Sequence, residues 1–227
     1  MAGTRAYALT VACIAALTGC HLSYTGGAKT VSAADLTADA ALIHAAPTPV
    51  VKQQSREDCG LAALAMVAGA WGRTWTVTDM ARELPPTSKG VKLGKLRDFA
   101  RGRGLDAYAI KGTFKDLETE LRAGRPVMLG LVLPFDQKNN LSHYEVVVAL
   151  DPTDQTVITR DPATGDLMRR ARKVLDVEWK TAGYATLVVV GDKTPVQTAA
   201  QPEPGGDHVE GIDVRDRSGA PRRIGMQ

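Results

Sequence analysis

One short polar segment carries residue types that nucleophilic chemistry requires. Residues 53–60 read Gln-Gln-Ser-Arg-Glu-Asp-Cys-Gly, and a run of small apolar residues follows from Leu61 to Gly69. A polar loop therefore turns into a helix at Cys59, where unpaired backbone N–H groups and the helix dipole favour a thiolate. Because the thiolate is the nucleophilic form, Cys59 is a candidate nucleophile. The common alternative is a small, buried, apolar cysteine.

His143 is the candidate base for this thiol. A nucleophilic cysteine needs a base, a group that orients the base and donors for an oxyanion. The chain has four histidines, of which His21 and His44 fall in a predicted spacer and His208 in a predicted tail. His143 alone lies in the predicted domain, at the start of a strand. A lone histidine at such a place is more often structural, but here it is the single option.

Asp161 is the candidate that orients His143. The predicted hairpin of residues 144–160 turns at Asp151-Pro152, and its simplest register puts Asp161 opposite Tyr144. A one-residue bulge or a tighter turn pairs His143 with Asp161 directly. In either register a carboxylate lies at the same end of the hairpin as the imidazole and can fix its tautomer. The alternative is that Asp161 only starts a turn, as Asp151 is expected to do.

Two glutamines are candidates for the oxyanion donor. Gln53 lies six residues before Cys59, and a loop of that length can bring its amide beside the thiol. The backbone N–H of Cys59 would be the second donor. Gln54 is an equal candidate from sequence alone. Asp58 is expected to cap the helix that begins at Cys59.

The first residues of the chain predict a targeting segment. An apolar run from Ala6 to Leu17 is too short to span a bilayer as a mature helix. It ends in Leu-Thr-Gly-Cys at residues 17–20, which resembles the bacterial lipobox. The resemblance implies cleavage before Cys20 and acyl chains on that cysteine, which would anchor the chain stably. An ordinary signal peptide that contains a cysteine is the alternative.

The remaining cysteines support the choice of Cys59. Cys13 would leave with the signal and Cys20 would carry lipid, so Cys59 would be the only free thiol of the exported chain. No intramolecular disulfide could then form. One cysteine and one histidine cannot build a structural zinc site, and no metal or organic cofactor is expected.

Composition sets the domain organisation and excludes several partners. The 227 residues are 44% hydrophobic with a formal charge of +3, which argues against nucleic acid as a partner. No Walker loop is present, so no nucleotide is expected. Four parts are predicted: a signal at 1–19, a lipid-anchored spacer at 20–46, a domain at 47–191 and a flexible tail at 192–227.

The order of elements within the domain predicts an α+β fold. Helices are expected first, and their predicted ranges are 59–70, a short helix from 78 or 79 to before Pro85, 93–103 and 114–123. Short Val-rich runs at strand length follow, at 126–133, 144–150, 156–160 and 184–190, and a strand at 105–111 precedes them. A further short helix is expected within 166–179. Helices packed on an antiparallel sheet describe this order.

Together these residues resemble cysteine peptidase family thirty-nine, the papain-like bacteriocin-processing peptidases that cleave leader peptides after a double glycine. The motifs are Gln53, Asp-Cys-Gly at 58–60, His-Tyr-Glu-Val-Val at 143–147, Asp-Pro at 161–162 and Trp179 before the last strand. The resemblance implies a papain-like fold and a peptide substrate cut after small residues. It also implies Cys59 as nucleophile, His143 as base, Asp161 as orienting residue and Gln53 rather than Gln54 in the oxyanion hole.

Two departures from the family leave other functions open. Glu145 stands where the family usually has a hydrophobic residue, and the exporter helices and ATPase of many members are absent from this sequence. A catalytically silent peptide-binding or assembly lipoprotein is one alternative. A cell-wall peptide hydrolase of the NlpC type is another, but that group typically uses a second histidine. The lipobox implies attachment in the cell envelope facing the periplasm, and the absence of Asp at position 21 favours the outer membrane by analogy.

Overall fold

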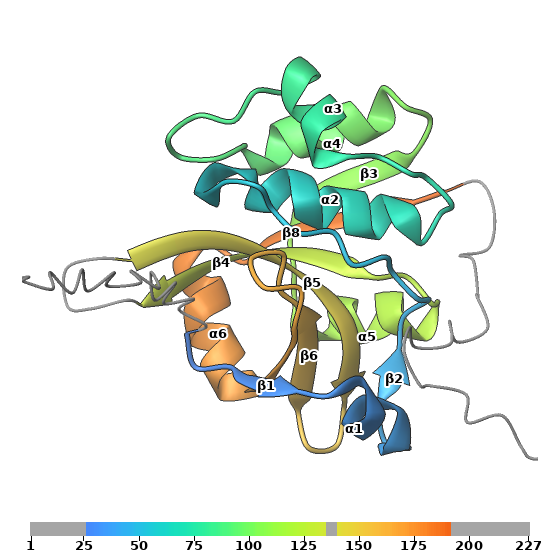
Figure 1. The fold of residues 1–227 in the computed structure, drawn as a ribbon. Helices are drawn as coiled ribbons and strands as arrows, with labels where there is room; N and C mark the ends of the chain where they lie inside the picture. Colours follow the sequence, from blue (N-terminus) through green and yellow to red (C-terminus); the bar gives the residue numbers. More distant parts are fainter. Residues whose placement is uncertain (1–25, 135–139, 192–227) are drawn as a thin grey trace, which may run out of the picture. The chain divides into compact units, whose positions relative to one another are not determined.

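The computed structural model describes residues 26–134 and 140–191, and Figure 1 shows their arrangement. The helices are α1 (Ala33–Ala38), α2 (Cys59–Gly69), α3 (Val77–Glu83), α4 (Leu93–Arg101), α5 (Phe114–Arg122) and α6 (Arg172–Thr181), with a short 3-10 turn at Arg56–Asp58. The strands are β1 (Lys29–Val31), β2 (Ile43–His44), β3 (Asp106–Lys111), β4 (Val127–Pro134), β5 (Asn140–Asp151), β6 (Thr156–Arg160), β7 (Leu167–Ala171) and β8 (Ala185–Val190).

The strands form one antiparallel sheet in the order β1-β7-β6-β5-β4-β8-β3, and β2 pairs with β5. The central hairpin of β4 and β5 is the longest pairing and runs from Val127 opposite Val147 to Pro134 opposite Asn140. Strand β3 is the edge strand at the end opposite β1, and it pairs with β8, the last strand in the sequence. The predicted α+β class with an antiparallel sheet is confirmed.

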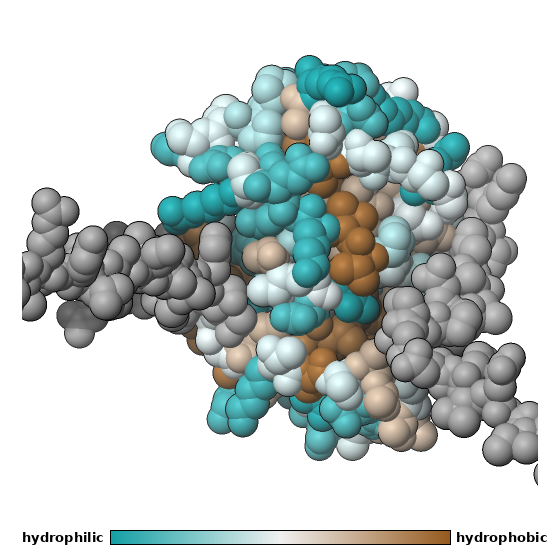
Figure 2. All heavy atoms as spheres, in the orientation of Figure 1, coloured by the Kyte–Doolittle hydropathy of each residue, from teal (hydrophilic) through white to brown (hydrophobic). Residues whose placement is uncertain are grey.

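Helices cover both faces of this sheet (Figure 1). Successive residues of a strand face opposite sides, so Val146 of β5 packs with α2 and α4 while Val147 packs with α5 and α6. The predicted helix starts at 59, 93 and 114 are confirmed, and their ends differ by one or two residues. Seen from this side, hydrophilic side chains cover much of the α3 and α4 end, and apolar ones lie in a band below it (Figure 2).

Helix α2 is the central helix of the domain. Its residues from Cys59 to Ala68 are all buried, because small side chains allow close approach on every side. A side-chain carbon added at Gly60 would lie 3.1 Å from atoms of both Leu96 and Tyr144. The sequence run that follows Cys59 therefore fixes the thiol between α4 and β5.

The segment at 20–46 that was predicted to be a spacer is partly folded into the domain. Its described part contributes β1, which pairs with β7, and β2, which pairs with β5, and both Leu42 and Ala46 are buried. Apart from this segment, strand β7 has a free edge, and β5 extends beyond its pairing with β4 to Ala149 and Leu150. Both offer unpaired backbone groups, so a segment rich in Ala, Thr and Ser can join the sheet without an apolar pattern of its own. The predicted signal at 1–19, Cys20 and the tail at 192–227 lie outside the described residues.

Two strands also differ from the sequence-based prediction. Strand β5 begins at Asn140, so His143 lies inside the strand, opposite Leu131, rather than at its start. Strand β7 was not expected, because its sequence Leu-Met-Arg-Arg-Ala is too charged to read as a buried strand. In the part of the chain that the structure describes, no helix has the length and apolar character needed to cross a membrane.

Candidate active site

The site begins at the first residue of α2. Cys59 is 5% exposed and is a free thiol. The expected capping role of Asp58 is wrong: its carboxylate makes no capping bond to α2 and instead accepts from the backbone N–H of Ser55 at 2.9 Å. The carboxylate therefore closes the 3-10 turn that leads into the helix. This leaves the first N–H groups of α2 without a side-chain cap at the thiol.

His143 lies between Asp161 and Cys59. Its Nε2 is 2.7 Å from Oδ1 of Asp161, and both side chains are buried. Cys59 is close enough to His143 for its side chain to raise the pKa of the imidazole. With Nε2 donating to the carboxylate, Nδ1 is the nitrogen that remains for the thiol. The structure thus brings together three of the candidate residues, from α2, from β5 and from the segment after β6.

The register of the hairpin explains this contact and differs from the predicted one. Leu150 pairs with Val157, and a bulge between Val147 and Ala149 brings Val146 opposite Arg160. Continuing that register puts residue 161 level with 145, so Asp161 is a diagonal neighbour of His143 rather than its direct partner. Strand β6 ends at Arg160, and the chain turns there, which frees the Asp161 side chain to reach the imidazole.

Asp161 also starts a turn, so the contact with His143 and the turn, which were alternatives from the sequence, occur together in one side chain. Its Oδ1 accepts from the backbone N–H of Ala163 at 2.8 Å, and its carbonyl accepts from Gly165 N–H at 2.7 Å. Gly165 has a φ of +84°, which glycine adopts without strain. Asp151 makes the same kind of turn, accepting from Thr153 N–H at 2.7 Å, but the structure gives it no histidine partner among the described residues.

The electrostatics of the site favour a protonated imidazole. Burial by itself lowers the pKa of His143, but the hydrogen bond to Asp161, the side chain of Cys59 and the charges of Glu145 and Asp161 raise it to about 10. Burial raises the pKa of Asp161, yet the bond from His143 and the backbone N–H of Ala163 hold it below its usual value. Burial and the nearby Cys59 raise the pKa of Tyr144 to about 12. The pair is therefore an imidazolium with a carboxylate at neutral pH.

The two glutamines have different surroundings. Gln54 is exposed and donates its amide to Oγ1 of Thr78 at 3.1 Å. Gln53 is partly buried, and its backbone N–H donates to the carbonyl of Pro162 at 2.9 Å, beside Asp161. Its buried Oε1 has no hydrogen-bond partner within the described ranges. A half-turn of the amide exchanges its oxygen and nitrogen, so Gln53 can present a free donor where Gln54 is already engaged.

One buried cluster beside the site was not predicted. Arg170 pairs with both Glu145 and Glu178, and the three side chains are at most 2% exposed. Sequence reasoning noted Glu145 as a departure from the family but gave it no role. The signal that could have found the cluster is a charged residue at a buried strand position with an arginine in the next hairpin.

The same region contains a group of potential metal ligands. Ligand atoms of His143, Glu145 and Asp161 lie within 4.8 Å of one another. Both oxygens of Glu145 accept from Arg170 at 2.6 Å, and Asp161 accepts from His143. Each carboxylate thus already has a cationic partner, which fits an ion-pair network better than a bound cation.

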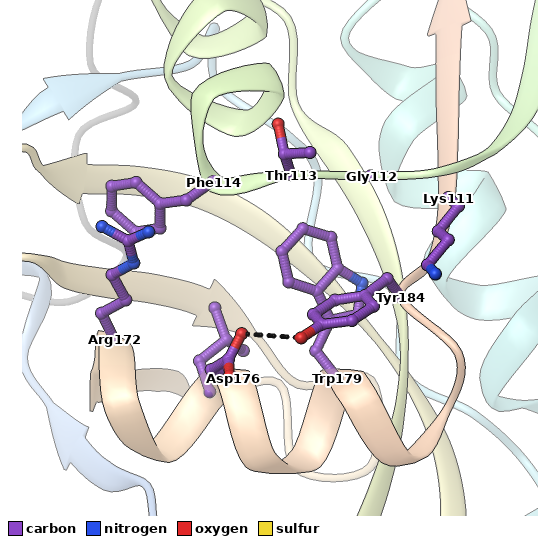
Figure 3. A pocket seen from close by; sticks show the side chains of 9 residues that line it. Lys111, Gly112, Thr113, Phe114, Arg172, Asp176, Trp179 and Tyr184 are labelled. Carbon is purple, nitrogen blue, oxygen red and sulfur yellow. Dashed lines mark hydrogen bonds between the residues drawn. The ribbon is translucent and has the colours of Figure 1, made fainter.

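A separate pocket of about 290 Å³ lies between the end of β3, the start of α5, α6 and Tyr184 just before β8, and none of the candidate site residues lines it (Figure 3). Its walls carry the rings of Phe114, Trp179 and Tyr184, and the hydroxyl of Tyr184 donates to Asp176 at 3.2 Å. The guanidinium of Arg172 lies 4.5 Å from the centre of the Phe114 ring.

The comparisons agree with this architecture, in which a central helix starts at a cysteine and packs on an antiparallel sheet, as in papain-like cysteine peptidases. The sequence model of the Peptidase C39 family matches residues 47–189. This match covers more than half of the chain, and the protein belongs to the Peptidase C39 family of cysteine peptidases. No curated protein matches the chain.

Solved structures share the fold. The peptidase domain of Streptococcus ComA, a bi-functional ABC transporter, has a TM-score of 0.51 at 21% identity, covering 63% of this chain and 97% of that one. A double glycine motif protease from an AMS/PCAT transporter, in complex with the leader peptide, has a TM-score of 0.52 at 19% identity, covering 65% and 94%. A C39-like peptidase from Bacillus anthracis has a TM-score of 0.53 at 17% identity, covering 64% and 96%.

Proposed function

We propose that this protein is a lipid-anchored peptidase in which Cys59 attacks the peptide carbonyl, His143 transfers the proton and Asp161 orients the imidazole. The observation that carries the proposal is the buried contact of 2.7 Å between His143 and Asp161, next to a cysteine at a helix start. The raised pKa of His143 supports an imidazolium that can protonate a leaving amine at neutral pH.

The mechanism has two stages. The Cys59 sulfur forms a bond to the carbonyl carbon of the peptide, and the negative charge moves to the carbonyl oxygen. Collapse of this intermediate breaks the C–N bond, and His143 gives its proton to the departing amine. Neutral His143 then takes a proton from water as the water attacks the acyl carbon, and the Cys59 sulfur leaves. This step releases the acid product and returns Cys59 and His143 to their starting state.

The oxyanion is assigned to two donors. These are the backbone N–H of Cys59 at the uncapped start of α2 and the side-chain amide of Gln53. The engagement of Gln54 with Thr78 supports the choice of Gln53. The buried Oε1 of Gln53 has no partner within the described ranges, and a half-turn of the amide would put Nε2 there as a donor to an oxyanion.

For the substrate we propose a peptide with small residues before the cut, of the double-glycine kind. The family supports this proposal, and one structural neighbour is described as a double glycine motif protease in complex with the leader peptide. The lipobox-like residues 17–20 support anchoring through Cys20 in the cell envelope, facing the periplasm and more specifically at the outer membrane.

The test compares two fluorogenic peptides that differ only in Gly-Gly or Leu-Leu before the cut. We expect the parent protein to cleave the Gly-Gly peptide faster, and Cys59→Ala to cleave neither while it stays folded and lipidated. Iodoacetamide should alkylate Cys59 faster than a free peptide thiol from about pH 5 to about pH 9. Equal alkylation together with no cleavage would contradict the catalytic role, and equal cleavage of both peptides would contradict the substrate class.

A further inference from the structure

The cluster of Glu145, Arg170 and Glu178 is the strongest unexplained feature beside the site. Arg170 of β7 holds both oxygens of Glu145 at 2.6 Å, in a two-point contact, and donates its Nε to Glu178 of α6 at 2.8 Å. The hydroxyl of Thr159 also donates to Glu145. Glu178 accepts in addition from the backbone N–H of Gly27 at 2.8 Å. Each side chain of the network is therefore fixed by a hydrogen bond or ion pair to another member.

Stability alone gives a poor reason for this network. Removing charged groups from water is costly, and apolar residues of similar volume are often as stable or more stable in place of a buried ion pair. The surrounding core is apolar, with Leu129 opposite Glu145 in the sheet. Retaining three ions there therefore points to a role that apolar side chains could not fill.

The position of Glu145 suggests that role. It lies two residues after His143 on β5, so the two side chains share one face of the strand. Ligand atoms of Glu145 lie within 4.8 Å of those of His143 and Asp161. Within the described ranges Glu145 makes no hydrogen bond to the imidazole, so it acts on His143 through its charge.

We propose that the ion pair of Glu145 and Arg170 positions His143, with Arg170 fixing the Glu145 carboxylate beside the imidazole as a second negative charge in addition to Asp161. The inference rests on the proposed function in that His143 is taken as the proton carrier. Glu145 is a positioning residue, because it touches neither the thiol nor a substrate. Glu178 fixes the pair through its bond from Arg170, and Thr159 through its bond to Glu145.

The charges around His143 set the expected direction of change. The imidazole faces Cys59 from α2, Asp161 from the turn after β6 and Glu145 from its own strand, with Arg170 behind Glu145. The charge of Glu145 raises the pKa of His143, and the charge of Arg170 lowers that of Asp161. Neutralising Glu145 therefore lowers the pKa of His143 and leaves its bond to Asp161 in place.

Glu145→Gln in the full chain is the main variant, because it keeps the shape and an acceptor for Thr159 but removes the charge. The imidazole NMR signal of His143 should titrate at lower pH, and above the midpoint its protonated fraction should fall by about tenfold for each unit of displacement. The kcat for the Gly-Gly peptide should fall by about tenfold on the alkaline side with little change in KM. Glu118→Gln, which loosens the exposed pair with Arg122 on α5, is the matched control and should match the parent.

A second variant separates positioning from folding. Glu145→Leu with Arg170→Leu and Glu178→Gln removes all three charges together, so that no buried ion is left without its partner. It should unfold at a temperature no lower than that of Glu145→Gln, yet show the same displaced titration. A parental titration and kcat in either variant would overturn the proposal. Failure of both variants to fold would also overturn it, since the pair would then serve the fold.

The NMR titration needs no substrate, so it separates this inference from the proposed function. If the parent cleaves no peptide but Glu145→Gln displaces the titration, the proposed function fails and the electrostatic role of Glu145 stands. If the parent cleaves the peptide and the variants match it in every measurement, the function stands and this inference fails.

Discussion

Replacing Asp161 tests whether its carboxylate does more than start a turn. Asp161→Asn keeps an oxygen that can accept from Ala163 N–H, so the turn should survive. It removes the charge that lies 2.7 Å from Nε2 of His143. Asp151→Asn is the matched control, because Asp151 also precedes a proline and accepts from backbone N–H groups, those of Thr153 and Asp154.

The magnitude follows from the kind of bond that is lost. A hydrogen bond to a charged group contributes about 1.5–3 kcal/mol, and about 1.4 kcal/mol is tenfold in rate, so kcat should fall by roughly 10- to 150-fold. KM should change little, since Asp161 is buried behind the imidazole. The loss of a negative partner also lowers the pKa of His143, so the alkaline limit of activity should move to lower pH.

The assay is the pH profile of kcat for the Gly-Gly peptide, with thermal unfolding measured in parallel. Because the folded-state pKa of Asp161 is lowered, its carboxylate stabilises the fold above the unfolded pKa of about 3.9, and this contribution disappears as pH falls through the folded value. Asp161→Asn should therefore lower the melting temperature at neutral pH and change it less in acid. Equal kcat and equal pH limits in Asp161→Asn and Asp151→Asn would refute the reasoning.

Three further predictions concern the oxyanion donor, the imidazolium and the anchor. Gln53→Ala should lower kcat by about a hundredfold, the usual size for one oxyanion donor, while Gln54→Ala stays within about twofold of the parent; the reverse order in a kinetic assay would exchange their roles. Activity should persist to about pH 9 and fall as pH rises through the pKa of His143 near 10. The stability that this imidazolium contributes should be complete below about pH 6.5 and be lost as pH rises to the same pKa. A loss of activity already at neutral pH would contradict the raised pKa. Cys20→Ser should move the protein from the membrane fraction to the soluble fraction with kcat unchanged, as membrane fractionation and peptide cleavage would show, and a variant that stays in the membrane would exclude the lipobox.

The local parts of the fold could be predicted because their signals are local. The small-residue run fixes a helix that starts at Cys59, and Thr113 with Asp116 forms the capping box at the start of α5. Alternating or Val-rich runs identify most strands of the central sheet to within a few residues. The family resemblance also rests on sequence order, and the match over residues 47–189 confirms it.

The remaining features of the fold and the site depend on strand pairing and ion pairing, which join residues that are distant in sequence. A bulge after Val147 shifted the hairpin, so Asp161 meets His143 diagonally rather than across the ladder. Arg170 is 1% exposed within a charged strand, because Glu145 and Glu178 meet it there. No local pattern in Leu-Met-Arg-Arg-Ala reveals those partners, and the strand was missed for that reason.

By itself, the sequence determined which groups are available for chemistry: a thiol at a helix start, an imidazole on a strand, a carboxylate beyond the next strand, and their order along the chain. Tertiary structure decided their environment. It placed Gln53 beside the Asp161 turn while Gln54 bonds to Thr78. It also made the segment that was predicted as a spacer part of the sheet, through β1. The physical reason is that residue types and local geometry are encoded within a few positions, whereas burial and charge pairing depend on which distant segments pack together.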